Sequence, residues 1–166
     1  MNRRQISTLL ALEELGIEPK LDLFRDRLVL QKAVYLVQAA GCELGYFYGW
    51  YLHGPYCSAL AKDVFAVVED PESLDELGDR WVLDDESLKQ LQRLQALIPV
   101  NRANLPRHLE LLASVHYLIT RNQLPDRQPR TVMERLGKFG KNFTEEEVKE
   151  AITALQGAGL LNVAEG

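Results

Sequence analysis

The side chains best suited to bind a metal ion or attack a substrate are few and widely spread in this 166-residue chain. A zinc site needs Cys, His or carboxylate ligands at short spacing. His53 and Cys57 are four residues apart but flank a Gly-Pro pair, and the sequence holds no second pair to complete a ligand set. His108 and His116 would lie about 12 Å apart along one predicted helix, too far for one ion. The spacing therefore predicts no metal site and three histidines with surface or structural roles.

Catalytic motifs are also missing from the sequence. It contains no nucleophile elbow, no glycine-rich phosphate loop and no dinucleotide-binding fingerprint. Carboxylates are plentiful, but they fall where loops and helix caps are expected, and ordinary solvation accounts for them there. We therefore predict a non-enzymatic protein with no catalytic residue and no cofactor.

Composition predicts one folded domain. Hydrophobic residues make up 46% of the chain and charged residues 26%, which is enough apolar material for a packed core. We expect a single domain over residues 1–166, with its weakest seam near 98–104. No apolar run has the length of a membrane span and no signal peptide is evident, so we predict a cytoplasmic protein. Cys42 and Cys57 are then expected to be reduced, buried thiols.

Charge is distributed unevenly along the sequence. The formal net charge of −5 does not favour a general nucleic-acid binder. Residues 69–86 hold nine acids and one base, whereas residues 121–141 hold six bases and two acids. Such segments can steer a charged partner, or they can be two solvated faces.

The elements that position these residues are mainly helical. Apolar periodicity predicts helices at about 3–15, 23–40 and 58–68, the second capped by Asp22. Further helices are expected from Asp84 or Asp85 to Ile98 and from Asn104 to about Ile119. Pairs of Thr and Glu that form capping boxes, beginning at Thr131 and Thr144, predict helices at 132–138 and 145–156.

Strand-forming residues are confined to two short stretches. Residues 46–52 are aromatic and predict a strand that Gly54-Pro55 ends. The segment Arg80-Trp-Val-Leu83 is β-prone and is expected to pair with it, while the acidic residues around 70–73 are expected to form a loop. The predicted fold class is mainly α: a compact bundle of about six to seven helices with a two-stranded β-ribbon and a winged-helix-like N-terminal half.

The predicted helix at 23–40 is apolar on nearly all sides, which is typical of a helix at the centre of its domain. Gln31 and Lys32 interrupt its apolar surface, and buried polar groups must form hydrogen bonds. One interpretation is that Gln31 fixes the backbone near Gly54-Pro55 and that Lys32 extends to solvent. The other is that both line a groove beside the aromatic strand and contact a partner.

The aromatic residues around the predicted strand are open to the same two interpretations. Side chains alternate across a strand, so only about half of them can face the core. The others would be exposed aromatic residues, which are typical anchors of protein interfaces. The set is Tyr46, Phe47, Tyr48, Trp50, Tyr51 and Tyr56.

Two segments resemble the Panacea antitoxin-like superfamily, which includes SocA-type antitoxins and YwgA-type proteins. They are Phe24-Arg-Asp-Arg-Leu-Val-Leu-Gln31-Lys32-Ala-Val-Tyr35-Leu-Val and Tyr48-Gly-Trp-Tyr-Leu-His-Gly54-Pro55-Tyr56-Cys-Ser58-Ala-Leu-Ala-Lys-Asp63. The resemblance covers about residues 20–70, and the segment that begins at Phe143 is similar to the C-terminal part of YwgA-type proteins. It implies a small, mainly helical bacterial cytoplasmic protein without a cofactor. Such proteins bind a toxin, or hand a toxin to a protease.

The first functional hypothesis is therefore a protein-interaction module. The sequence shows no separate toxin-binding extension, which favours the YwgA-type branch. Neither composition nor motif excludes a homodimer, and no membrane partner is expected. The candidate partner contacts are Gln31, Lys32, Tyr35, Tyr48, Trp50, Tyr51, Gly54, Pro55, Tyr56 and Ser58.

The second hypothesis is a DNA-binding regulator. The predicted element order is close to a winged helix, and residues 131–155 could form a helix-turn-helix. The presumed recognition helix begins Glu145-Glu-Glu, and three acids at the end that approaches DNA oppose binding, so we prefer a protein partner to nucleic acid. In this hypothesis the phosphate contacts are Arg127, Arg130, Arg135, Lys138 and Lys141.

Overall fold

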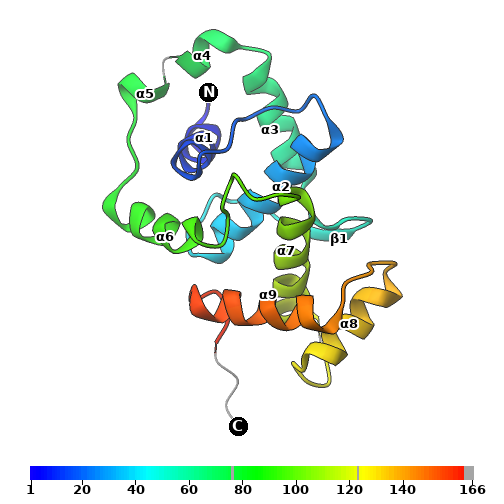
Figure 1. Cartoon of the computed structure of the whole chain (residues 1–166). Coiled ribbons are helices and arrows are strands. Elements are labelled where there is room, and N and C mark those ends of the chain that lie inside the picture. The colour runs from blue at the N-terminus through cyan, green and yellow to red at the C-terminus, as the bar shows by residue number, and fades with distance from the viewer. Residues whose placement is uncertain (76, 123, 163–166) are drawn as a thin grey trace.

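Helices make up most of the chain, as the apolar periodicity predicts. The computed structural model describes residues 1–75, 77–122 and 124–162, with the side chains of 78 and 79 excepted. Within these residues, seven helices have seven residues or more, and a single two-stranded antiparallel hairpin accompanies them (Figure 1). The predicted mainly α bundle with a small β-ribbon is confirmed. None of the described helices is both long and apolar enough to cross a membrane.

The elements follow one another along the chain as α1 (Arg3–Leu15), α2 (Phe24–Ala39), β1 (Gly49–Tyr51), β2 (Gly54–Tyr56), α3 (Ser58–Val68), α4 (Pro71–Asp75), α5 (Leu77–Arg80), α6 (Asp85–Gln95), α7 (Leu105–Arg121), α8 (Pro129–Lys138) and α9 (Glu145–Gly157).

The centre of the molecule is the packing of α2 against α7. Val34 and Leu36 on α2 and Leu112 and Val115 on α7 are fully enclosed, which is what a helix apolar on most sides requires. Helices α1, α3 and α6 surround α2, whereas α8 and α9 pack against each other and against α7 (Figure 1). The hairpin contacts both central helices.

The hairpin is formed by neighbouring segments, so the predicted pairing of the aromatic strand with residues 80–83 is wrong. Trp50 lies opposite Pro55, and the turn between the two strands is Leu52-His53. Gly54 has a φ of +89°, a conformation that glycine adopts without strain and that lets the chain reverse tightly. A two-stranded hairpin has two open edges, so it tolerates Pro55, which has no N–H to donate.

Several predicted helix boundaries also need correction. Leu23, not Asp22, precedes α2, and its N–H donates to the Asp26 carboxylate at 3.1 Å. Thr131 lies inside α8, which begins at Pro129 because proline suits the first turn of a helix. The acidic stretch after residue 70 forms the short helix α4 rather than a loop.

The predicted capping box at the start of α9 is confirmed. The Glu147 N–H donates to Thr144 Oγ1 at 3.0 Å, and the Thr144 N–H donates to the Glu147 carboxylate at 3.1 Å. Cys42 and Cys57 are buried free thiols, as predicted.

Candidate functional site: a groove beside the hairpin

Two glutamines on α2 fix the hairpin to the centre of the molecule. Gln31 Nε2 donates to the Cys57 carbonyl at 2.8 Å, and the Cys57 N–H donates to Gln31 Oε1 at 2.9 Å. Gln38, two turns further along α2, forms the same pair of bonds with the backbone of Tyr46, at 3.0 and 2.9 Å. The prediction that Gln31 fixes the backbone near Gly54-Pro55 is confirmed, whereas the sequence reasoning missed Gln38.

Lys32 does not extend to solvent, so that expectation is wrong. The hairpin lies across this side of α2, the residue is 1% exposed, and its Nζ donates to the Pro55 carbonyl at 2.5 Å. Burial lowers the pKa of the Lys32 amine to about 8, an effect that the negative charge of Glu110 opposes. Lys32 is therefore a desolvated cation beneath the hairpin.

A second buried lysine holds the hairpin turn from the side of the C-terminal helices. Lys141 Nζ lies 2.6 Å from Glu110 Oε1 and donates to the Leu52 carbonyl at 3.2 Å. The same Glu110 oxygen lies 3.9 Å from His53 Nδ1. Because Lys141 is buried in this ion pair, it is not exposed for the phosphate contact that the DNA-binding hypothesis gave it.

Gly54 sits directly against the central helix α7. A Cβ added to Gly54 would lie 2.5 Å from Ser114 Oγ and 3.9 Å from Lys32 Nζ. Ser114 is completely buried, and its Oγ has no hydrogen-bond partner in the described part of the chain. Only a glycine fits this position, because both the φ and the space exclude a side chain.

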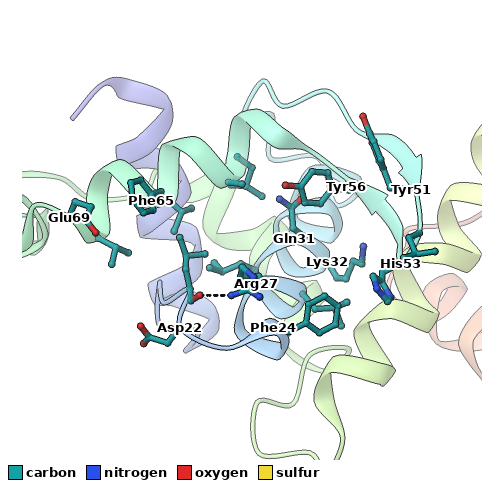
Figure 2. Close-up of a pocket in the computed structure, with 18 residues that line it drawn as sticks. Asp22, Phe24, Arg27, Gln31, Lys32, Tyr51, His53, Tyr56, Phe65 and Glu69 are labelled. Atoms are coloured by element: carbon teal, nitrogen blue, oxygen red, sulfur yellow. Dashed lines mark hydrogen bonds between the residues drawn. The ribbon is translucent and has the colours of Figure 1, made fainter.

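An apolar groove opens beside this junction. It has a volume of about 690 Å³ and runs between the N-terminal half of α2 and α3, with the hairpin at one end (Figure 2). Its apolar lining includes Leu28, Leu60 and Val64, and the exposed Arg27 also lines it and donates to the Leu21 carbonyl at 2.9 Å. A groove of this size and lining is typical of a binding site.

Exposed aromatic side chains border the groove. Phe24 is 54% exposed, Phe65 is 58% exposed, and Tyr51 is exposed to a similar degree. Figure 2 shows Phe65 on α3 at the end away from Tyr51 and the hairpin. Sequence reasoning missed Phe24 and Phe65. One signal in the sequence could have indicated Phe65: a large aromatic residue directly follows Val64, a position that the apolar periodicity places in the core.

The structure brings together four of the ten candidate partner contacts. Gln31, Lys32, Tyr51 and Tyr56 all line the groove. Tyr51 and Tyr56 are cross-strand neighbours, with ring centroids 5.3 Å apart. Gln31 therefore fixes the backbone and also lines a groove, while its contact with a partner stays a prediction.

The other six candidates lie elsewhere. Tyr35 and Tyr48 are buried in the core, where they do not form part of the surface. Trp50 is half-buried and packs on Tyr117 and Phe139, with ring centroids 5.5 and 4.9 Å away. Gly54 and Pro55 are buried in β2, and Ser58 is exposed at the start of α3.

The histidines have the structural or surface roles that their spacing predicts. His116 is buried: its Nε2–H donates to the Leu160 carbonyl at 3.2 Å, and its Nδ1 accepts from the Tyr35 hydroxyl at 2.7 Å. Burial lowers the pKa of His116 to about 4. His108 Nε2 lies 2.9 Å from the Leu97 carbonyl. Within residues 1–75, 77–122 and 124–162, no group of three potential ligands could hold a metal ion.

The remaining basic candidates for phosphate contacts lie on or just before α8. Arg127 precedes α8, while Arg130, Arg135 and Lys138 lie on it, and Arg130 Nε is 3.2 Å from the Glu134 carboxylate. The first turn of α9 carries three acids, as predicted, and one of them, Glu147, pairs with Arg107 at 2.6 Å.

No family model matches the chain and no curated protein matches it, so its function has to be inferred from the groove itself.

Proposed function

We propose that the chain is a protein-interaction module and that the groove beside the hairpin binds an apolar helix of a partner protein. The observation that carries the proposal is the apolar groove bordered by the exposed rings of Phe24, Tyr51 and Phe65. Folded monomers rarely expose neighbouring aromatic residues around a concavity unless something binds there.

The dimensions of the groove favour a helical segment. One wall is α3 from Leu60 to Val68, nine residues that span about 13 Å at 1.5 Å per residue. That length equals roughly two and a half turns of a bound helix, enough for apolar anchors at positions i, i+3 or i+4, and i+7. A third helix can then pack its apolar face between α2 and α3.

The resemblance of residues 20–70 to the Panacea antitoxin-like superfamily supports the same class of function. On that resemblance the partner is a toxin, or a protease to which the chain delivers one. Such a role needs binding energy and specificity, but no catalytic group or cofactor. The groove supplies both, because buried aromatic anchors at the centre of an interface usually contribute most of the binding free energy.

Two phenylalanines offer a matched test of this proposal. Phe65 borders the groove, whereas Phe47 is 93% exposed and lies outside it. Both are on the surface, so neither Phe65→Ser nor Phe47→Ser should alter the fold, which circular dichroism and thermal melting will check. Tagged chain is purified from the cells that express it naturally, and co-purified proteins are quantified by mass spectrometry.

We expect at least one protein to co-purify with the unaltered chain and with Phe47→Ser, and to be reduced tenfold or more with Phe65→Ser. A residue at the centre of an interface typically contributes 1–2 kcal/mol or more, which corresponds to about that factor. Recovery of the same proteins in the same amounts with all three chains would show that the groove is not the binding surface.

A further inference from the structure

The floor of the groove contains a positive charge that no acid neutralises. Lys32 lines the groove, and among the described residues no carboxylate lies within ion-pair distance of its Nζ. Glu110 acts on Lys32 electrostatically, but its carboxylate already lies 2.6 Å from Lys141. These three groups, two cations and one carboxylate, leave one positive charge in excess. Such a charge is costly to bury, because water no longer solvates it.

The hydrogen-bonding capacity around this charge is also incomplete. The Lys32 ammonium has three N–H groups, and the described residues give it one acceptor, the Pro55 carbonyl. The buried Ser114 Oγ also has no hydrogen-bond partner among the residues that the structure describes. Both atoms approach the same point on Gly54. Ser114 is completely buried and does not line the groove, so a ligand there can meet only the Lys32 ammonium, for which a carboxylate would be both an acceptor and a counter-charge.

The two ends of the groove differ in charge. Lys32 lies at the hairpin end, whereas Asp22 and Glu69 lie at the other end, near Phe65 (Figure 2). Both acids are exposed and would repel a carboxylate placed beside them. Arg27 also lines the groove, but it is exposed and its charge is solvated by water, so the cation that gains most from a bound carboxylate is Lys32 at the hairpin end.

We infer that the partner helix carries an Asp or Glu side chain at one end of its apolar face, and that this carboxylate pairs with Lys32 beneath the hairpin. This inference rests on the proposed function, because it specifies the chemistry of the segment that fills the groove. The apolar anchors contact α2 and α3, and the acid sets the direction and register of the helix. The lowered pKa of Lys32 supports the inference, because it reports an ammonium whose lost hydration is not replaced.

The probe is a displayed library of random 12-residue peptides, selected separately on four chains. These are the unaltered protein, Lys32→Met, Lys62→Met and Phe65→Ser. Lys62 is the matched control, because it is an exposed lysine on α3 that does not line the groove. Circular dichroism and melting curves establish that each variant is folded. Selected peptides are then synthesised with their acid intact or changed to the amide, and their Kd values are measured.

We expect the unaltered chain and Lys62→Met to select peptides that have apolar residues at helical spacing and an Asp or Glu at one end. Lys32→Met should keep the apolar pattern and lose the acid. Changing the acid to its amide should weaken binding to the unaltered chain at least tenfold and leave binding to Lys32→Met unchanged. If Lys32→Met does not fold, the amide comparison is made on the unaltered chain and on Arg27→Met: an acid preference that persists in Arg27→Met supports pairing with Lys32, and one that is lost there overturns it.

The peptide selections distinguish a failure of the Lys32 inference from a failure of the proposed function. Apolar peptides without an acid, lost on Phe65→Ser, would overturn the inference and support the proposed function. Acidic peptides that bind Lys32→Met equally well would also overturn the inference. Peptides that bind Phe65→Ser as well as the unaltered chain, or no enrichment on any chain, would count against the groove itself and hence against both proposals.

Discussion

The hairpin junction, formed by α2 with residues 46–57, and the C-terminal helix pair, formed by α8 and α9, use polar residues in opposite ways. In the hairpin junction, Gln31 and Lys32 are buried and face the backbone of the hairpin. In the C-terminal helix pair, Arg130 and Glu134 pair on the surface. Water can replace a lost contact in the second region but not at the buried Gln31 and Lys32 of the first. Polar residues of the first region therefore have large structural effects, and those of the second region have small ones.

Within the hairpin junction, neighbouring residues have different functions. The Gln31 amide is matched by one N–H and one carbonyl of Cys57, so it stabilises the fold and has little left to offer a ligand. The Lys32 ammonium has an acceptor but, within the described part of the chain, no carboxylate at ion-pair distance. A polar group whose hydrogen bonds are all formed stabilises the fold. A polar group beside a groove whose hydrogen bonds are only partly formed can contribute more binding free energy to a ligand.

The largest effect is expected from Gly54→Ala. The new Cβ would lie 2.5 Å from Ser114 Oγ at a φ of +89°, so steric overlap adds to backbone strain. We expect a loss of about 4 kcal/mol in the free energy of unfolding, measured by urea denaturation. Gly140 is the control: its φ is +76°, but a Cβ there meets no atom within 4 Å, so Gly140→Ala should cost only about 1 kcal/mol. Equal losses would show that close packing against Ser114 is unimportant.

Gln31→Leu is expected to cost about 3 kcal/mol, because it leaves the N–H and carbonyl of Cys57 buried without partners. Gln38→Leu removes the same two bonds to Tyr46 at a half-buried position, where water can replace them. We expect that variant to cost about 1 kcal/mol. Equal costs would mean that solvent access does not distinguish the two ends of the hairpin junction.

Acid should destabilise the protein through His116, which joins the two regions by bonding Tyr35 on α2 and the Leu160 carbonyl beyond α9. Its pKa is about 4 when folded and about 6.5 when unfolded, so between these values the unfolded chain binds the additional proton. This contribution to stability is full above pH 6.5 and is lost as the pH falls towards 4. At pH 5 the loss relative to pH 7 is about 2 kcal/mol.

Urea denaturation at several pH values tests this expectation. In His116→Gln the decrease between pH 7 and pH 5 should be smaller by that amount. Burial also lowers the pKa of the half-buried His108, so a shallower dependence of the same sign should remain. An unchanged slope in His116→Gln would mean that His116 is not held neutral by the fold.

Sequence reasoning succeeded where one residue type has one physical solution. A glutamine on an apolar helix must find hydrogen bonds, and Gln31 finds them near Gly54-Pro55, as predicted. It failed where the outcome depends on another element. Whether Lys32 reaches water depends on the hairpin that covers it. The β-prone segment at 80–83 does not pair with the aromatic strand, because the tight turn at Leu52-His53 lets that strand pair with residues 54–56 instead.

The sequence predicted only some of the residues that line the groove, because the groove also depends on how separate elements pack. Periodicity identifies the inward residues of each helix, and Leu60 and Val64 of α3 are buried as expected. A groove between helices also needs exposed apolar residues on facing sides, and their arrangement depends on how α2 and α3 pack. Phe24 and Phe65 border the same groove because of that packing, which no local pattern reports.

The smallest effect is expected on the surface of the C-terminal helix pair. Arg130 and Glu134 are both well exposed, so their ion pair competes with water and Arg130→Ala should change the free energy of unfolding by less than about 0.5 kcal/mol. Arg107→Ala is the informative comparison, because Arg107 bonds both oxygens of Glu147 and the Asn142 carbonyl and stacks on Phe143. It should cost about 1 kcal/mol. If Arg130→Ala cost as much as the glutamine substitutions in α2, solvent access would not be what separates the two regions.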